Sequence, residues 1–226
     1  GWFVFDIEDC IRLYKKHHPQ VVCLTSPTNP TGNVMRVKDI ERILKVVDKT
    51  TLVILDELYI WFDSGYEAAA VLKLLARYSN LVLLRSFSKY YALAGMRKAY
   101  ALCGKNVVEM IKYQPRLLGF SRILEATALA AMASDSYYRG LAADTIRDRE
   151  WFIKQTNTLA NFKAYGSHGN FVLMRVNKKV VNKLKTALTR EPVLIVKDIT
   201  KDLFRVSVGV FKYTKRLFTV LQKLDT

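Results

Sequence analysis

Short apolar runs alternate with helical patterns along this chain, and this alternation restricts the possible fold more than any other feature. Residues 21–25, 52–55 and 81–84 have the length and composition of buried strands. Between these runs, residues 37–48 and 67–78 carry apolar side chains at helical spacing. Strands that alternate with helices in this way indicate an α/β protein with a mostly parallel sheet.

Polar residues follow each of the three runs. A loop at residues 26–32 follows the first run, Asp56 ends the second, and the segment 86–97 follows the third. In open α/β sheets, ligands bind beyond the carboxyl ends of the strands. We therefore expect these three segments to meet at one edge of the sheet.

A second α/β pattern follows a long helical segment. That helix is expected over residues 135–161, with a break near Gly140. We expect further strands at 99–103, 171–176, 193–196 and 203–208, and further helices at 107–118, 121–133, 180–189 and from Lys212 onward. A boundary near residue 135 would separate a large-domain part, residues 1–135, from a linker helix and small C-terminal domain, residues 136–226.

The chain carries a formal net charge of +16, from 36 basic and 20 acidic residues among 226. Such a charge could attract nucleic acid or anionic small molecules. Because no nucleic-acid-binding motif organises the basic residues, a generally basic surface is favoured, with attraction of anionic substrates second. No apolar run is long enough to cross a bilayer, and no signal peptide is visible, so we expect a cytoplasmic protein.

Cys10, Cys23 and Cys103 are odd in number and widely spaced. Cys23 and Cys103 lie in apolar runs that are typical of buried strands, so reduced structural thiols are expected. His168 is isolated in the sequence, and no Cys/His spacing indicates a metal site.

Lys89 is the strongest candidate for a chemical role. It lies three residues after Ser86 and directly after Ser88, and Arg97 follows it by eight residues. An amine can condense with an aldehyde, and hydroxyls with a guanidinium can hold a phosphate. Most single lysines lie on the surface, but the apolar run 81–84 before this segment favours a desolvated amine, which becomes nucleophilic.

Three motifs follow one another along the chain: Asn29-Pro30-Thr31-Gly32, Asp56-Glu57-Leu58-Tyr59 and the lysine segment 86–97. Their order resembles that of the fold type I pyridoxal-phosphate aminotransferases, in the branch of histidinol-phosphate aminotransferase. The resemblance implies pyridoxal 5'-phosphate as cofactor and makes Lys89 the Schiff-base lysine. It also implies that Asp56 pairs with the pyridine nitrogen, so that the ring can accept carbanion electrons. Tyr59 and Asn29 would donate hydrogen bonds to the phenolic oxygen.

The same resemblance assigns the phosphate and the substrate. Ser86, Ser88 and Arg97 match the residues that bind the cofactor's phosphate. Arg205 matches the arginine that clamps the substrate α-carboxylate, and Asn170 matches a segment near the substrate. Leu58 departs from the family, which usually has a small residue there.

These assignments predict transfer of an amino group between an amino acid, or an amino alcohol phosphate, and a 2-oxo acid. Two alternatives stay open: a threonine-phosphate decarboxylase, and a truncated domain that binds protein or nucleic acid without catalysis. An N-terminal portion of the family cannot be located in this sequence. A partner chain that supplies this portion is one expectation. The resemblance also implies a homodimer, because members of this family are usually dimers.

Overall fold

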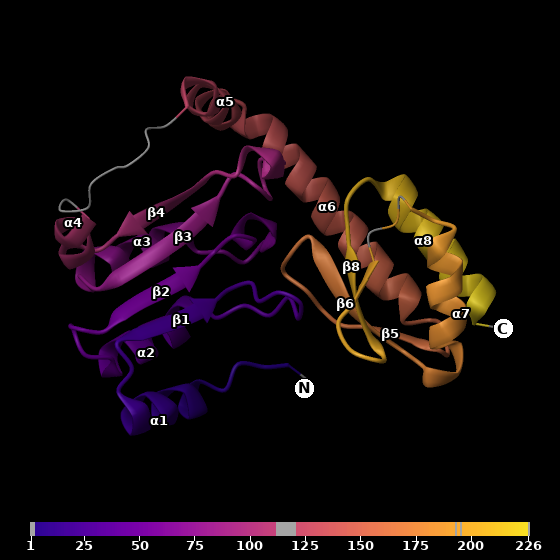
Figure 1. Cartoon of the computed structure of the whole chain (residues 1–226), viewed down its shortest axis with the longest axis horizontal. Helices are drawn as coiled ribbons and strands as arrows, with labels where there is room; N and C mark the ends of the chain where they lie inside the picture. The colour runs from indigo at the N-terminus through magenta and orange to yellow at the C-terminus, as the bar shows by residue number, and fades with distance from the viewer. Residues whose placement is uncertain (1–2, 112–120, 193, 195, 226) are drawn as a thin grey trace.

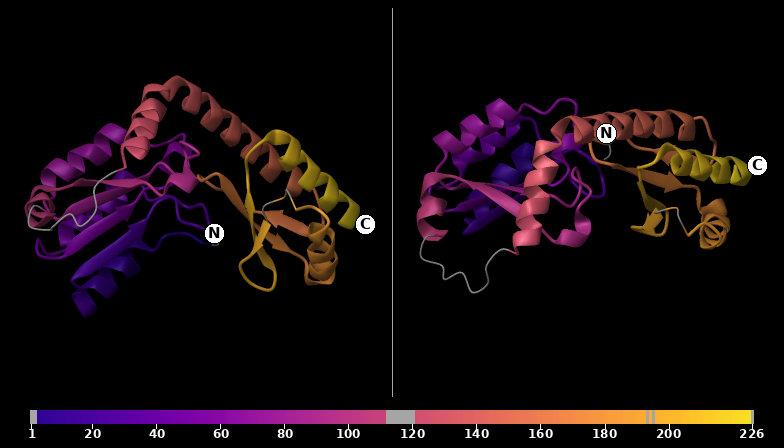
Figure 2. Two further views of the ribbon diagram at one scale, coloured as in Figure 1. Left: turned by 45° about the horizontal axis from the view of Figure 1, so that its top comes forward. Right: turned by 90° about the horizontal axis from the view of Figure 1, so that it is seen from above.

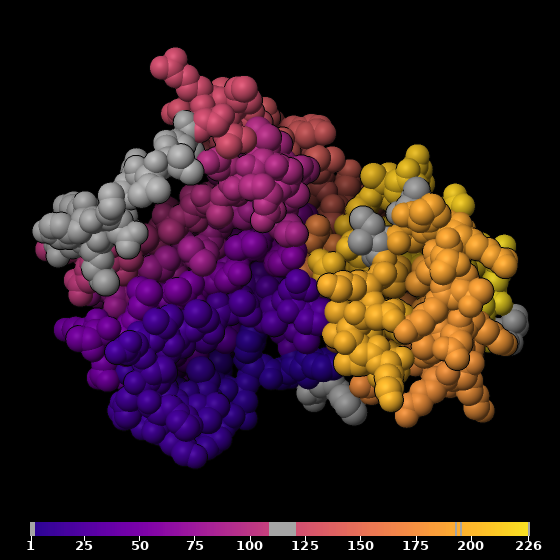
Figure 3. Space-filling view, viewed as in Figure 1, coloured from indigo at the N-terminus to yellow at the C-terminus, as the bar shows by residue number. Residues whose placement is uncertain are grey.

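The computed structural model describes residues 3–111, 121–192, 194 and 196–225. They form two α/β parts, each with its own sheet, and the long helix α6 (Asp135–Thr156) runs from one part to the other (Figure 1). Turned views show α6 lying along both parts (Figure 2). The space-filling view shows these parts in contact (Figure 3).

The first sheet has four strands in the order of the sequence: β1 (Val21–Thr25), β2 (Leu52–Asp56), β3 (Leu81–Ser86) and β4 (Ala99–Cys103). The first three are parallel, and β4 is antiparallel to β3. Thr25 is paired with Asp56, and Asp56 with Leu84, so the carboxyl ends of three strands coincide.

Three helices cover one face of this sheet: α1 (Ile7–His17), α2 (Val37–Val46) and α3 (Ala68–Arg77). Alternate strand residues such as Val53, Leu55 and Leu83 are fully buried in the same cluster as Ile43 of α2. Burial of each such side chain stabilises the fold by about 1.5–3 kcal/mol before the entropy of ordering is subtracted. This cluster holds the strand ends, and thus the candidate site residues, in fixed register.

The second sheet is antiparallel in the order β5-β6-β8-β7, with strands β5 (Phe162–Ala164), β6 (Phe171–Val176), β7 (Val196–Asp198) and β8 (Leu203–Ser207). Its core packs against α6, α7 (Lys178–Thr189) and α8 (Phe211–Leu224). Phe152 of α6 and Phe204 of β8 are completely buried there. Helix α6 also contacts the 3-10 turn η1 (Ile60–Phe62) of the first part, and thereby joins the two cores.

Two further helices, α4 (Lys105–Ile111) and α5 (Arg122–Ala133), complete the described secondary structure together with the 3-10 turn η2 (Ala94–Met96). The expected α/β architecture, with a mostly parallel first sheet, is confirmed. We still propose a domain boundary near residue 135, where α6 begins.

Several expected bounds were wrong. Helix α6 has no break at Gly140, because it continues through this residue without interruption. It ends at Thr156, since residues 162–164 pair with β6 as the extra strand β5. The strand expected at 193–196 begins at Val196 among the described residues, and residues 112–118 of the helix expected at 107–118 lie outside them.

The prediction that Cys23 is buried was also wrong. Leu24 points into the core beneath the helices, so Cys23 points to the opposite face, because side chains alternate along a strand. The strand β1 is an edge strand, and Cys23 is exposed while Val21 keeps 47% of its surface exposed. Cys103, on the other edge strand, is half-buried.

None of the described helices is long and apolar enough to span a membrane. Within the described residues, no cluster of three or more His, Cys, Asp or Glu side chains could hold a metal ion.

Candidate functional site

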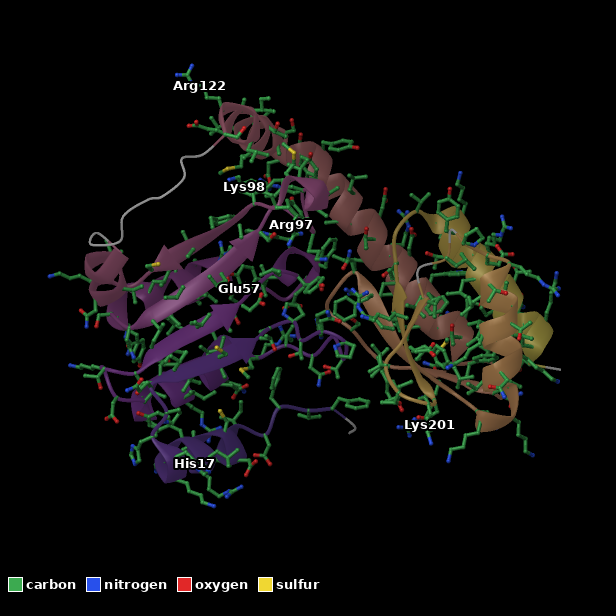
Figure 4. The ribbon with its side chains drawn as sticks, in the orientation of Figure 1. His17, Glu57, Arg97, Lys98, Arg122 and Lys201 are labelled. Carbon is green, nitrogen blue, oxygen red and sulfur yellow. The ribbon has the colours of Figure 1, made fainter. Side chains whose placement is uncertain are left out.

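The three candidate segments meet at the carboxyl edge of the first sheet. The backbone N–H of Ser26 donates to the carbonyl of Asp56 at 2.9 Å, which fixes the start of the 26–32 loop against the end of β2. The N–H of Glu57 donates to the carbonyl of Leu84 at 2.9 Å, which ties the end of β2 to β3. Figure 4 shows Glu57 and Arg97 at this end of the sheet. The expectation that topology brings these segments together is therefore correct.

Lys89 lies in the turn that follows β3, and buried aromatic rings hold this turn in place. Phe87, Tyr90 and Tyr91 belong to one buried cluster with Phe62 of η1. Burial raises the pKa of Tyr90 to about 12, and the neighbouring Asp135 adds to that shift. Lys89 lies between Phe87 and Tyr90 in the sequence. Its side chain is half-buried and lines a pocket, so it is not an ordinary surface lysine.

The phosphate-binding candidates lie next to Lys89. The hydroxyl of Ser86 accepts a hydrogen bond from the backbone N–H of Ser88 at 2.9 Å and donates to the carbonyl of Lys98 at 3.1 Å. Arg97 is exposed and adopts a left-handed backbone with φ 52°; its guanidinium donates to the carbonyl of Ala94 at 3.3 Å. The structure thus brings Ser86 and Ser88 into contact and leaves donors of Arg97 turned toward solvent.

Asp56 and Asn29 lie at the same edge. One carboxylate oxygen of Asp56 accepts from the backbone N–H of Leu58 at 2.9 Å, so the side chain is oriented by its own turn. Asn29 is exposed on the 26–32 loop. Gly32, which ends that loop, has φ 77° and packs so closely on Ser167 that a Cβ would lie 2.2 Å from its hydroxyl oxygen.

A pocket of about 600 Å3 lies between the two parts of the molecule. The first part contributes the turn after β3, with Ser88 and Lys89, and the second contributes Asn170 and Arg205. The remaining walls include apolar and hydroxyl side chains of the second part, namely Leu194, Ser207, Val208, Val210, Tyr213, Thr214 and Leu217. Lys89 and Arg205 therefore face one cavity, although they lie 116 positions apart in the sequence.

Arg205 is held in this pocket with unused hydrogen-bonding capacity. Its guanidinium carbon lies 4.4 Å from the ring centroid of Phe171, and Nη1 donates to the Ser207 hydroxyl at 3.1 Å. Its Nε is buried and has no hydrogen-bond partner among the described residues. Burial lowers the pKa of Arg205, and Tyr59 partly opposes this shift. An anion in the pocket would satisfy Nε and offset the cost of burying the charge.

Aromatic contacts connect the two walls of the pocket. The rings of Tyr59 and Phe171 meet edge to face with centroids 5.0 Å apart. Asn170, the residue before Phe171, has a buried Oδ1 without a hydrogen-bond partner in the described part of the chain. The pocket therefore contains both a buried donor, on Arg205, and a buried acceptor, on Asn170.

Sequence reasoning missed a buried ion pair beneath this site. Arg85 donates through Nε to a carboxylate oxygen of Glu57 at 2.9 Å, and both side chains are almost fully buried. The Tyr66 hydroxyl lies 2.5 Å from Nη2 of Arg85, and the Trp61 ring lies under the guanidinium. Burial raises the pKa of Glu57, and Arg85 opposes the increase. The sequence offered one signal for this pair, which is that Glu57 directly follows Asp56 at the end of a strand that is expected to be buried.

Asp63, Arg149 and His168 were also missed. His168 was dismissed because it is isolated in the sequence, yet its ring contacts Asp63. No local pattern could show that contact, because 105 residues separate the two positions.

The fold and the lysine-containing pocket define the class of the protein as a fold type I aminotransferase-like α/β protein. The sequence model of the aminotransferase class I and II family matches residues 2–217. The chain belongs to this family.

Relatives from the same branch cover nearly the whole chain. Histidinol-phosphate aminotransferase 2 of Archaeoglobus fulgidus is 34% identical over 92% of this chain and 59% of its own length. The chloroplastic histidinol-phosphate aminotransferase of Nicotiana tabacum is 32% identical over 97% of this chain and 53% of its own. The chain thus spans somewhat more than half the length of these curated relatives.

Solved structures agree in fold. The histidinol-phosphate aminotransferase of Sinorhizobium meliloti, in complex with pyridoxal-5'-phosphate, superposes with a TM-score of 0.83 at 21% identity, over 97% of this chain and 61% of that one. A decarboxylase from Sulfurospirillum multivorans gives a TM-score of 0.85 at 21% identity, over 99% and 67%. Likenesses at this identity concern the fold and do not distinguish the two reactions.

Proposed function

We propose that this chain is the lysine-bearing portion of a pyridoxal-phosphate aminotransferase that exchanges an amino group between an amino acid, or an amino alcohol phosphate, and a 2-oxo acid. One observation carries the proposal: a half-buried lysine and a half-buried arginine, whose buried Nε has no hydrogen-bond partner among the described residues, line the same pocket. An amine that reacts with carbonyls and a guanidinium that holds a carboxylate are the two groups that such a substrate needs.

The residues at the carboxyl edge of the first sheet fit the cofactor of this family, pyridoxal 5'-phosphate. Ser88 and Lys89 line the pocket, whereas Asn29, Asp56, Tyr59, Ser86 and Arg97 are not among its lining residues. Asp56 would hold its ring nitrogen, and Tyr59 and Asn29 its phenolic oxygen. The phosphate would lie on Ser86, Ser88 and Arg97. The unused donors of Arg97 support the fit of the phosphate, because this guanidinium remains able to bind an anion. The unsatisfied Nε of Arg205 supports binding of the substrate carboxylate instead.

When bound, pyridoxal phosphate supplies an aldehyde that condenses with amines and a ring that accepts electrons. Arg205 binds the substrate α-carboxylate and orients the α-carbon toward Lys89. The amine of Lys89 removes the proton from that carbon and would pass it to the aldehyde carbon of the cofactor, C4′. In the second half of the exchange it would carry a proton in the opposite direction. Tyr59, packed between Lys89 and Phe171, excludes water from one side of the amine. Asn170 orients the substrate through its free Oδ1.

The assembly and location of the protein are part of the proposal. The proposed assembly is a homodimer, as is usual in this family, or a complex with a partner chain that contributes further residues to the site. The cytoplasm is the proposed location. Nucleic acid is not a favoured partner, since the basic residues serve no recognisable nucleic-acid motif.

The test is incubation with pyridoxal phosphate, candidate amino donors and a 2-oxo acid, with detection of the new amino acid. Transfer of the amino group would support the proposal. Release of carbon dioxide without transfer would favour the threonine-phosphate decarboxylase alternative. Absence of both reactions and of cofactor binding, with the missing portion of the family supplied on a second chain, would favour a non-catalytic domain.

A further inference from the structure

A buried carboxylate and a histidine join the two parts of the molecule beside the pocket. Oδ1 of Asp63 lies 2.7 Å from Nδ1 of His168. Asp63 directly follows η1 in the first part, and its side chain is only 2% exposed. His168 lies in the segment that leads into β6 of the second part. A short contact that involves a buried charge is among the stronger hydrogen bonds of a protein.

Arg149 joins the same two segments a second time. This residue lies on α6, and its side chain is 3% exposed. Its Nη1 donates to the carbonyl of Phe62 at 3.0 Å and to the carbonyl of Gly169 at 2.9 Å. Phe62 directly precedes Asp63, and Gly169 directly follows His168. The segment 62–63 is therefore connected to the segment 168–169 twice, once by the Asp63–His168 contact and once through Arg149.

The surroundings hold this contact in one geometry. Arg36 donates to the other carboxylate oxygen of Asp63 at 3.0 Å, and the N–H of Gly65 donates to Oδ1 at 3.2 Å. The backbone N–H of His168 donates to the carbonyl of Gly32 at 2.9 Å. His168 is therefore fixed both through its ring and through its backbone.

The bridged segments carry the two walls of the pocket. Phe62 and Asp63 come one turn after Tyr59, whose ring lies beside Lys89. Gly169 directly precedes Asn170 and Phe171, and Phe171 supports the guanidinium of Arg205. A displacement of residues 168–169 would move Asn170 and Phe171, and Arg205 with them.

We propose that Asp63, Arg149 and His168 form a clamp whose role is to position Asn170 and Arg205 opposite Lys89. None of the three lines the pocket, so they act through the residues that do. The ligand side of this inference rests on the proposed function, because it takes Arg205 and Asn170 as the carboxylate-binding residues.

The experiment compares His168→Ala and His168→Asn with wild-type protein, and uses His17→Ala as the matched control. Asn can place a donor where Nδ1 of His168 lies, whereas Ala cannot. His17 is exposed at the end of α1, far from the pocket (Figure 4). Arg149→Met, which keeps length but removes the donors, is a second test of the same clamp.

The first readout needs no ligand. Amide hydrogen exchange across residues 167–173 should be faster in His168→Ala, close to wild type in His168→Asn and unchanged in His17→Ala. Unchanged exchange in His168→Ala would overturn the clamp, whatever the protein binds.

The second readout is the Kd of 2-oxoglutarate, measured by calorimetry on protein loaded with pyridoxal phosphate. His168→Ala should weaken binding by at least about tenfold, the effect of losing one well-placed charged contact, and His168→Asn should restore most of it. Cofactor attachment at Lys89 should survive in all variants. If thermal stability falls in His168→Ala while the Kd stays unchanged, the contact is only structural and the positioning role is refuted. If wild-type protein does not attach the cofactor, the proposed function fails while the exchange data still decide on the clamp.

Discussion

The amine of Lys89 lies over the ring of Tyr59, with Nζ 5.3 Å from the ring centroid. A cation at this distance from an aromatic face is attracted by about 0.5–2 kcal/mol, depending on how far it is desolvated. The contact restrains a flexible side chain on the pocket side of its turn. Tyr59 in turn packs on Phe171, and the guanidinium of Arg205 stacks on the ring of Phe171. The amine of Lys89 and the guanidinium of Arg205 are therefore connected through one continuous row of side chains.

Arg205→Lys should weaken binding of 2-oxo acids by about 10–100-fold, because lysine keeps the charge but loses the planar pair of donors. Calorimetry with 2-oxoglutarate measures this loss. Arg175→Lys, on the next strand of the sheet, is the matched control and should leave the Kd unchanged. Equal affinity in Arg205→Lys and wild-type protein would contradict the role of Arg205.

Asp63→Asn should make the free energy of unfolding depend less on pH in the acidic range. Burial raises the pKa of Asp63, but hydrogen bonds from His168 and Gly65, with the charges of His168 and Arg36, outweigh it and leave the pKa below its ordinary value. A carboxyl whose pKa is lowered by folding contributes stability above its unfolded pKa, near 4, and this contribution is lost as the pH falls through the folded pKa.

Urea unfolding of the ligand-free protein between about pH 3 and pH 6 measures this effect. The decline in the free energy of unfolding toward low pH should be steeper in wild type than in Asp63→Asn. Asp144→Asn, on the exposed face of α6, is the control and should change stability at pH 7 by no more than about 0.5 kcal/mol. Parallel profiles for wild type and Asp63→Asn would refute the expectation.

Arg85→Met should destabilise the protein by about 3–5 kcal/mol at pH 7, since it leaves the buried carboxylate of Glu57 without its partner. The pKa of Glu57 is already raised by burial, and it would rise further without Arg85. Protonation of Glu57 would therefore relieve the loss, which should shrink as the pH is lowered. The double variant Glu57→Leu with Arg85→Met should lose less stability than Arg85→Met alone; a greater loss would mean that the pair is not an isolated unit.

Cys23 should react with a maleimide reagent before the other two thiols. It is exposed on β1, whereas Cys10 and Cys103 are half-buried. Burial raises the pKa of both of these thiols, with a further contribution from Asp9 at Cys10, and so reduces the reactive thiolate. Mass spectrometry of peptides from briefly labelled protein gives the order. First labelling at Cys103 would show that the open face of β1 is covered in solution.

The sequence was sufficient to predict the parallel strands and their carboxyl edge, because periodicity and strand length are local properties. It also predicted Lys89 and Arg205 as candidate residues, and the structure places both in one pocket. The burial of Cys23 was mispredicted for a physical reason: an apolar run does not reveal whether its strand lies at the edge of the sheet or which face is covered.

The contacts between the two parts could not be predicted. The partners of Arg149 are backbone carbonyls of Phe62 and Gly169, which leave no trace in residue identity. The end of α6 at Thr156 depends on the pairing of β5 with β6, a tertiary contact that overrides the helical pattern of the residues beyond it.

Borohydride reduction of the protein with pyridoxal phosphate, followed by peptide mapping, tests the central claim most directly. The cofactor should become fixed to Lys89, and Lys89→Ala should abolish this fixation, whereas Lys98→Ala should preserve it. Cofactor fixed mainly to other lysines, or fixed equally well in Lys89→Ala, would contradict the assignment of Lys89 and with it the proposed function.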